Sequence, residues 1–152
     1  MKLANIKNIC KKCKGTCCKL GGAEFTKKEM QKVIAAGYPD YFRKINNNHY
    51  ETLTKNGVCA YLKKDSLCSI QKLKPKMCYA WPVHLDFKGN KKINYLMICP
   101  LTPYLSEKEI KIMKKQMSGY TKEFIFCSDT KMSNNEVKQV MNRYNKFNKT
   151  IL

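Results

Sequence analysis

Nine cysteines in 152 residues constrain this chain more than any other feature. They occur at Cys10, Cys13, Cys17, Cys18, Cys59, Cys68, Cys78, Cys99 and Cys127. The number is odd, and the first nine residues contain no apolar stretch of the kind that forms a secretory signal. A complete disulfide framework fits such a chain poorly, because disulfides are typical of exported proteins. Metal binding by thiolates is the better interpretation, with disulfides as the alternative.

The first four cysteines form a cluster, Cys10-x2-Cys13-x3-Cys17-Cys18. A gap of two residues lets a tight turn direct two thiolates at one ion, with backbone N–H groups available to the sulfurs. On a helix Cys10, Cys13 and Cys17 would share one face, and Cys18 would point about 100° away. We therefore expect either that Cys18 serves a second centre or that the backbone leaves the helix, which Gly15 would allow. Nearby lysines would lower the pKa values of these thiols: Lys7, Lys11, Lys12, Lys14 and Lys19.

The remaining cysteines occur singly. Zinc and iron–sulfur clusters both take four thiolates, so eight cysteines could build two centres. One four-ligand centre with the other thiols buried or redox-active is the alternative. Cys127 follows the apolar residues Phe124, Ile125 and Phe126, which indicates a packed core thiol and not a ligand.

Three blocks of sequence carry a family pattern. They are Cys10 to Cys18, then Gly57 to Leu62 with Cys68 to Ile70, and then Lys74 to Pro82, with Cys99 closing the set. Together they resemble the YkgJ-type cysteine-cluster family, the CxxCxxCC proteins described as zinc- or iron-chelating. This chain has Gln71, Lys74 and Tyr79 where the family has tyrosine, arginine and arginine, and the cysteines are intact. The predicted metal ligands are Cys10, Cys13, Cys17, Cys18, Cys59, Cys68, Cys78 and Cys99.

The resemblance implies an iron–sulfur cluster or zinc. We favour an iron–sulfur cluster of the four-iron, four-sulfur (4Fe-4S) type, because adjacent and widely dispersed cysteines suit it. The expected function is redox or cluster support, or a metal-stabilised interaction module. Flagellin lysine N-methylases look like a related, longer group, so a protein-modifying enzyme is an alternative. No Gly-rich nucleotide loop and no paired carboxylates support catalysis here, and enzyme activity stays open.

The formal net charge of +19 comes from 30 Lys and Arg against 11 Asp and Glu. Only Arg43 and Arg143 are arginine, the residue preferred for bidentate phosphate contacts. Scattered lysines are typical of a solvated surface, although their field would attract an acidic protein partner. Nucleic-acid binding through this lysine-rich surface is a further alternative. No apolar run of 18 residues occurs, so we expect no membrane span and a cytoplasmic protein.

We predict one domain over residues 1–152, a small α+β fold centred on metal, with a helical C-terminal extension over about 106–152. Capping boxes predict helices over 26–36, 107–118 and 134–148. Alternating residues predict a hairpin over 83–98 that leads directly to Cys99, and a short strand over 58–62. In this prediction the metal replaces part of the hydrophobic core.

Three further side chains have specific expectations. His49 follows three asparagines and is predicted to be exposed in a polar loop. His84 lies on the predicted hairpin and could replace one thiolate in a Cys3His site. Trp81, which precedes Pro82, is expected to pack over the centre and exclude water.

Overall fold

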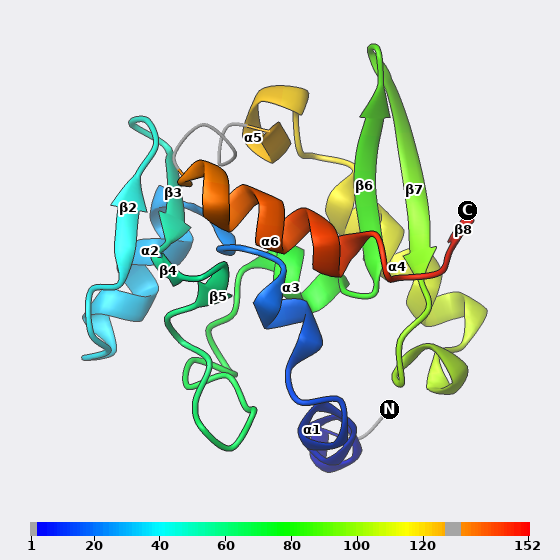
Figure 1. Ribbon diagram of the computed structural model, residues 1–152, viewed down its shortest axis with the longest axis horizontal. Helices are drawn as coiled ribbons and strands as arrows, with labels where there is room; N and C mark the ends of the chain where they lie inside the picture. Colours follow the sequence, from blue (N-terminus) through cyan, green and yellow to red (C-terminus); the bar gives the residue numbers. More distant parts are fainter. Residues whose placement is uncertain (1–2, 127–131) are drawn as a thin grey trace.

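A computed structural model describes residues 3–126 and 132–152 (Figure 1). The described helices are α1 (Leu3–Lys12), α2 (Lys27–Ala35), α3 (Lys76–Ala80), α4 (Glu107–Met117), α5 (Lys122–Phe126) and α6 (Asn134–Tyr144), with the 3-10 helices η1 (Thr16–Lys19) and η2 (Thr102–Tyr104). The described strands are β1 (Glu24–Thr26), β2 (Phe42–Lys44), β3 (His49–Thr52), β4 (Thr54–Lys55), β5 (Val58–Cys59), β6 (Val83–Lys88), β7 (Lys91–Met97) and β8 (Lys149–Ile151). Mixed helices and small sheets confirm the predicted α+β class.

The strands form three small antiparallel sheets. The first has the order β1-β3-β2, the second is the β4-β5 hairpin, and the third has the order β6-β7-β8. Figure 1 shows the first and third sheets at opposite ends of the molecule, with α6 crossing between them. The segments that carry most of the predicted ligands lie between these two sheets.

The three predicted helices are present, and each begins with its predicted capping box. Thr26, Ser106 and Ser133 accept a hydrogen bond from the backbone N–H three residues later, and the glutamate there accepts one from the cap's own N–H. The third helix ends at Tyr144, earlier than the predicted 148, where Asn145 takes the C-cap position. Helices α1, α3 and α5 were not predicted.

The predicted hairpin is confirmed. β6 and β7 pair from Val83 with Leu96 to Lys88 with Lys91, and they leave a two-residue turn of Gly89 and Asn90. The predicted strand over 58–62 is shorter, because β5 spans only two residues and pairs with β4 across a second tight turn. In that turn Asn56 and Gly57 both have positive φ, 54° and 71°, as a type I′ hairpin requires.

Two separate hydrophobic clusters form the described core. One lies between the third sheet and α4 and contains Ala80, Val83, Leu85, Met117 and Tyr120. The other lies against the first sheet and α2 and contains Phe25, Val33, Tyr61 and Ile70. Neither cluster is large. The groups that lie between the two clusters therefore contribute strongly to holding the two ends of the molecule together.

His49 corrects an expectation drawn from the sequence. It begins β3, is 2% exposed and is not in a solvent-facing loop. Its Nε2 pairs with the buried carboxylate of Glu24, and its ring stacks on Phe124 with ring centres 4.0 Å apart. The preceding asparagines form the polar turn, and the histidine itself is buried between Glu24 of β1 and Phe124 of α5.

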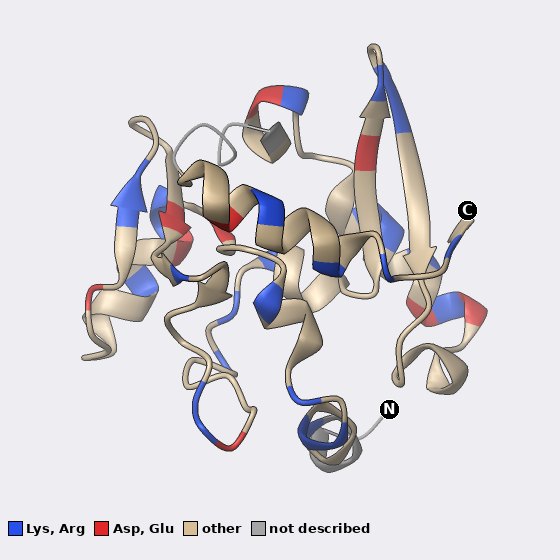
Figure 2. Cartoon of the chain, viewed as in Figure 1, with Lys and Arg blue, Asp and Glu red and all other residues tan. Residues whose placement is uncertain are grey.

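Basic residues are spread over the fold. Figure 2 shows lysine and arginine on helices, strands and loops, and not gathered on a single element. Within the described ranges, no helix combines the length and the apolar character needed to cross a membrane.

Candidate metal centre

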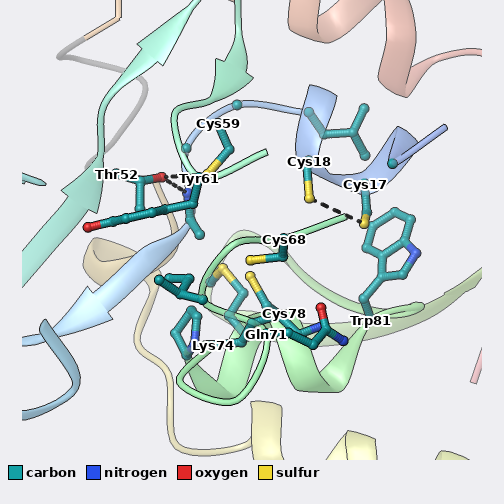
Figure 3. Close-up of a pocket in the computed structure, with 18 of the residues that line it drawn as sticks. Cys17, Cys18, Thr52, Cys59, Tyr61, Cys68, Gln71, Lys74, Cys78 and Trp81 are labelled. Carbon is teal, nitrogen blue, oxygen red and sulfur yellow. Dashed lines mark hydrogen bonds between the residues drawn. The ribbon is translucent and has the colours of Figure 1, made fainter. Parts of the chain in front are cut away.

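Six of the eight predicted ligands line one cavity of about 190 Å³ (Figure 3). Figure 3 shows the sulfurs of Cys18, Cys68 and Cys78 directed toward a shared space, with Cys59 and Cys17 at its margin. All eight predicted ligands are free thiols. The cysteines that line the cavity are Cys10, Cys17, Cys18, Cys59, Cys68 and Cys78.

A backbone reversal after α1 delivers the adjacent cysteines to this cavity. The chain leaves the helix at Lys14 and Gly15, whose φ angles are 55° and 62°. Such angles suit glycine, and a Cβ at Gly15 would lie only 2.7 Å from Leu62 Cδ1. Cys17 and Cys18 then lie on η1, with their sulfurs 3.9 Å apart. The backbone therefore leaves the helix before Cys17, as one of the two expectations for this cluster required.

Cys59 receives support from three neighbours. The Thr52 hydroxyl lies 3.3 Å from the Cys59 sulfur and itself accepts a hydrogen bond from the Ala23 N–H at 2.8 Å. Burial raises the pKa of Cys59, while hydrogen bonds from Thr52 and from the backbone of Tyr61 and Ala23 act in the opposite direction. Donors of this kind stabilise a thiolate and orient it toward a metal.

The adjacent pair Cys17 and Cys18 is electrostatically asymmetric. The hydrogen bond from Cys18 is the largest influence on Cys17 and lowers its pKa to about 7. The same contact, together with burial, raises the pKa of Cys18 well above its usual value. Cys17 is therefore the more readily ionised member of the pair, and a thiolate is the form that binds metal.

Lys74 is the cation of the site. Burial raises the pKa of Cys68 to about 11 and holds that of Cys78 well above its usual value. The Lys74 ammonium opposes this effect at both residues, and also at Cys10 and Cys17. One positive charge thus favours ionisation of four thiols around the cavity.

Cys13 and Cys99 lie outside the cavity lining. The Cys13 thiol donates to the Cys10 carbonyl at 3.3 Å, and the Cys99 sulfur accepts from the Thr102 hydroxyl at 3.6 Å. After burial, Cys17, Cys13 and Cys99 are the groups that raise the pKa of Cys10. Cys10 therefore links the cavity to these two thiols. Cys127 lies outside the described residues.

Aromatic side chains close the cavity on another side. Trp81, His84 and Tyr144 all line it, and Figure 3 shows the Trp81 indole beside Cys17. Trp81 meets Phe147 edge-on at 5.6 Å, and His84 lies 5.5 Å from the Tyr144 ring. Burial lowers the pKa of His84, so its imidazole is neutral near pH 7. These partly buried side chains form one wall of the cavity.

The thiols surround the cavity, and their sulfurs do not all lie close to a single position. In the part of the chain that the structure describes, no three Cys, His, Asp or Glu side chains are close enough to hold one ion as they stand. Free thiols around one cavity, with hydrogen-bond donors and a lysine beside them, are the groups that a zinc- or iron-binding site requires. The fold and site define a small cysteine-rich metal-binding domain.

Comparison with protein families agrees with this class. The chain belongs to the CxxCxxCC family, described as a "Putative zinc- or iron-chelating domain", whose sequence profile matches residues 9–116. The family resemblance drawn from the three cysteine blocks is thereby confirmed. Searches of curated proteins and of solved structures each gave no match.

Several supporting residues of the site were not predicted from the sequence. Lys74 stands out in the sequence only as a replacement for arginine within the third cysteine block. Thr52 carries no recognisable signal, since it is one of two threonines, with Thr54, in a mostly polar stretch. Tyr144 reaches the cavity from α6, far from any cysteine motif.

Proposed function

We propose that this protein binds iron–sulfur clusters through its eight predicted ligands and acts in electron transfer or in the support of a cluster within a larger redox assembly. The observation that carries the proposal is that six cysteines line a cavity of about 190 Å³, while no three of the described Cys, His, Asp or Glu side chains are close enough to hold one ion. The Cys17 and Cys18 sulfurs lie 3.9 Å apart, and no third such side chain joins them at one position. Four thiolates bound to one zinc at about 2.3 Å lie about 3.8 Å from one another. In a 4Fe-4S cluster each thiolate binds a different iron, so the thiolates stand further apart.

The effects of the thiols on one another's pKa values suggest two groups of ligands. Cys78 and Cys59 raise the pKa of Cys18, and Cys59 and Cys68 raise that of Cys78. Cys17 raises the pKa of all four of these thiols. We assign these four cysteines to one centre inside the cavity. Cys17, Cys13 and Cys99 raise the pKa of Cys10, with Cys17 the largest of the three influences. Cys17 therefore acts on both groups of thiols, and we place it with Cys10, Cys13 and Cys99 in the second group.

The protein's own residues prepare the site in three ways. The Lys74 ammonium offsets the negative charge that gathers when thiolates bind metal. Thr52 and backbone N–H groups donate to the Cys59 sulfur and orient it. Trp81 excludes water from the side of Cys17. A bound cluster would supply one-electron redox chemistry.

The test is anaerobic purification followed by iron, zinc and acid-labile sulfide analysis and an absorption spectrum of the same sample. A brown protein with iron and sulfide in equal amounts supports the proposal. A colourless protein with one or two zinc ions per chain would overturn it and make the centres structural.

Single substitutions test the ligand assignment. Cys78→Ser should remove the cavity centre and leave the other group, so iron per chain should fall by about half. Cys127→Ser, at a position not predicted to be a ligand, should retain the full iron content. Equal iron in Cys78→Ser and wild type would contradict the assignment.

A further inference from the structure

Arg143 of α6 joins two segments that each carry predicted ligands. Its Nη1 donates to the backbone carbonyl of Lys19 at 2.9 Å and to that of Asn56 at 3.0 Å. Lys19 directly follows Cys18, and Asn56 lies in the turn three residues before Cys59. A single guanidinium nitrogen therefore ties the segment of Cys18 to the segment of Cys59.

Glu136, two turns earlier on α6, holds the same hairpin from its other side. Its Oε1 accepts from the Thr54 hydroxyl at 2.8 Å and from the Gly57 N–H at 3.4 Å. Its Oε2 accepts from Ser133 in the capping box, so the carboxylate is fixed at the start of the helix. The position of the β4-β5 hairpin, and with it Cys59, is thus set by both ends of α6.

Gly57 lets α6 approach this closely. A Cβ at Gly57 would lie 2.6 Å from Val140 Cγ2 and 3.2 Å from Arg143 Nη1. The Gly57 carbonyl also accepts from the Gly21 N–H at 2.9 Å, which adds a direct bond between the two cysteine-bearing segments. The helix therefore packs on the junction itself and not on a neighbouring surface.

The whole of α6 lies outside residues 9–116, the part matched by the family profile. It nevertheless contributes Tyr144 to the lining of the cavity. Figure 1 shows α6 crossing the molecule between the first and third sheets, close to β5. The helix thus belongs physically to the site, although no cysteine motif extends to it.

We propose that α6 is a positioning element of the metal site, and that Arg143, with Glu136, sets the separation between Cys18 and Cys59. This inference rests on the proposed function, because the separation matters only if both thiolates hold metal. The guanidinium suits this task because its planar group presents several donors in a fixed geometry, which an ammonium does not.

The test compares the full chain with Arg143→Met, Arg143→Lys and the matched control Lys138→Met. Lys138 is exposed on the same helix, so its variant loses the same charge without touching the junction. Each protein is purified anaerobically, and the metal-loss rate to a chelator is measured with the absorption and electron paramagnetic resonance spectra. Loss of a group that orients a ligand typically weakens metal binding about 10- to 100-fold. We expect Arg143→Met to lose metal about tenfold faster with altered spectra, Arg143→Lys to be intermediate, and Lys138→Met to match wild type.

Equal rates and spectra in Arg143→Met and wild type would overturn the inference while leaving the proposed function intact. If wild type itself holds no metal, the proposed function fails. The positioning role of Arg143 is then tested in the reduced, metal-free chain. There a short bifunctional thiol reagent should join Cys59 to Cys18 more slowly in Arg143→Met than in Lys138→Met. The same comparison applies if a variant folds too poorly to retain metal, with Arg143→Lys in place of Arg143→Met. Equal cross-linking rates would contradict the role of Arg143.

Discussion

At the scale of single residues, Lys74 makes the sharpest electrostatic prediction. Its ammonium lowers the pKa values of Cys10, Cys17, Cys68 and Cys78 against the effect of burial. Without that charge the thiols hold protons to higher pH, and protons compete with metal for the same sulfurs. As the pH is lowered, Lys74→Met should therefore release its metal at a pH about one unit higher than wild type does. Metal content measured across a pH series checks this.

The controls for Lys74 separate charge from packing. Lys74→Arg keeps the positive charge and should stay close to wild type. Lys72→Met removes an exposed lysine two residues away and should leave the pH of metal loss unchanged. A Lys74→Met protein that releases metal at the wild-type pH would show that this ammonium does not act on the thiols.

Thr52 makes a prediction about stability. Its hydroxyl accepts from the Ala23 N–H and contacts the Cys59 sulfur, and the residue is fully buried. Thr52→Val keeps the shape but leaves the part-buried Ala23 N–H without its side-chain partner, which costs about 1 kcal/mol. Urea denaturation at equal metal content should show that loss in the free energy of unfolding. Thr52→Ser retains the hydroxyl and should recover most of it, whereas equal losses in the two variants would point to packing.

The sequence identifies the cysteines but not the residues that tune them. Spacing alone brings Cys10, Cys13, Cys17 and Cys18 into one cluster, and six of the eight predicted ligands do line one cavity. The division of the thiols between centres depends on distances across the fold, which no local pattern encodes. Lys74 and Thr52 act on sulfurs that only the folded chain brings near them.

At the scale of elements, local signals explain which parts were predictable. Capping boxes and the alternation of β6 and β7 are encoded within a few residues, and all were predicted. The Asn56-Gly57 turn carried an equally local signal for a tight hairpin that the predicted single strand did not use. The prediction that His49 is exposed was wrong, because the ring is covered by Phe124 of α5, which is distant in sequence.

The first sheet makes a prediction about pH. Glu51 on β3 is fully buried, and burial raises its pKa to about 7, although Arg43 pairs with it and acts in the opposite direction. The folded state then holds more protons than the unfolded state between about pH 4.5 and 7, so stability falls as pH rises through that interval. Glu51→Gln removes this contribution. The free energy of unfolding of Glu51→Gln relative to wild type should therefore rise from pH 4.5 to 7.

The comparison at each pH removes the effect of thiol titration, because both proteins carry the same cysteines. Glu107→Gln, in the exposed first turn of α4, is the matched control and should show no such rise. A difference that falls with pH would mean that pairing with Arg43 outweighs burial and that the Glu51 pKa is lowered.

At the scale of the whole molecule, the cysteine cavity lies between two small hydrophobic clusters. Phe25, Tyr61 and Ile70 belong to the cluster at the first sheet and also line the cavity, while Met77 lines it from the other cluster. The His49 ring of the first sheet stacks on Phe124 of the other cluster and joins the two ends directly. Ligands from both ends would make a bound metal a second connection between them, as in small domains where binding energy contributes to folding.

Removal of the metal should thus loosen the contact between the two ends. Trp81, the single tryptophan, faces the cavity beside Cys17 and reports on this directly. We expect a chelator to remove the near-ultraviolet circular dichroism of Trp81 and most of the dispersion of the methyl signals in the NMR spectrum. Restoring the metal under reducing conditions should bring both back. A metal-free chain with wild-type dispersion would show that the two clusters hold the fold without the thiolates, and that the metal serves function alone.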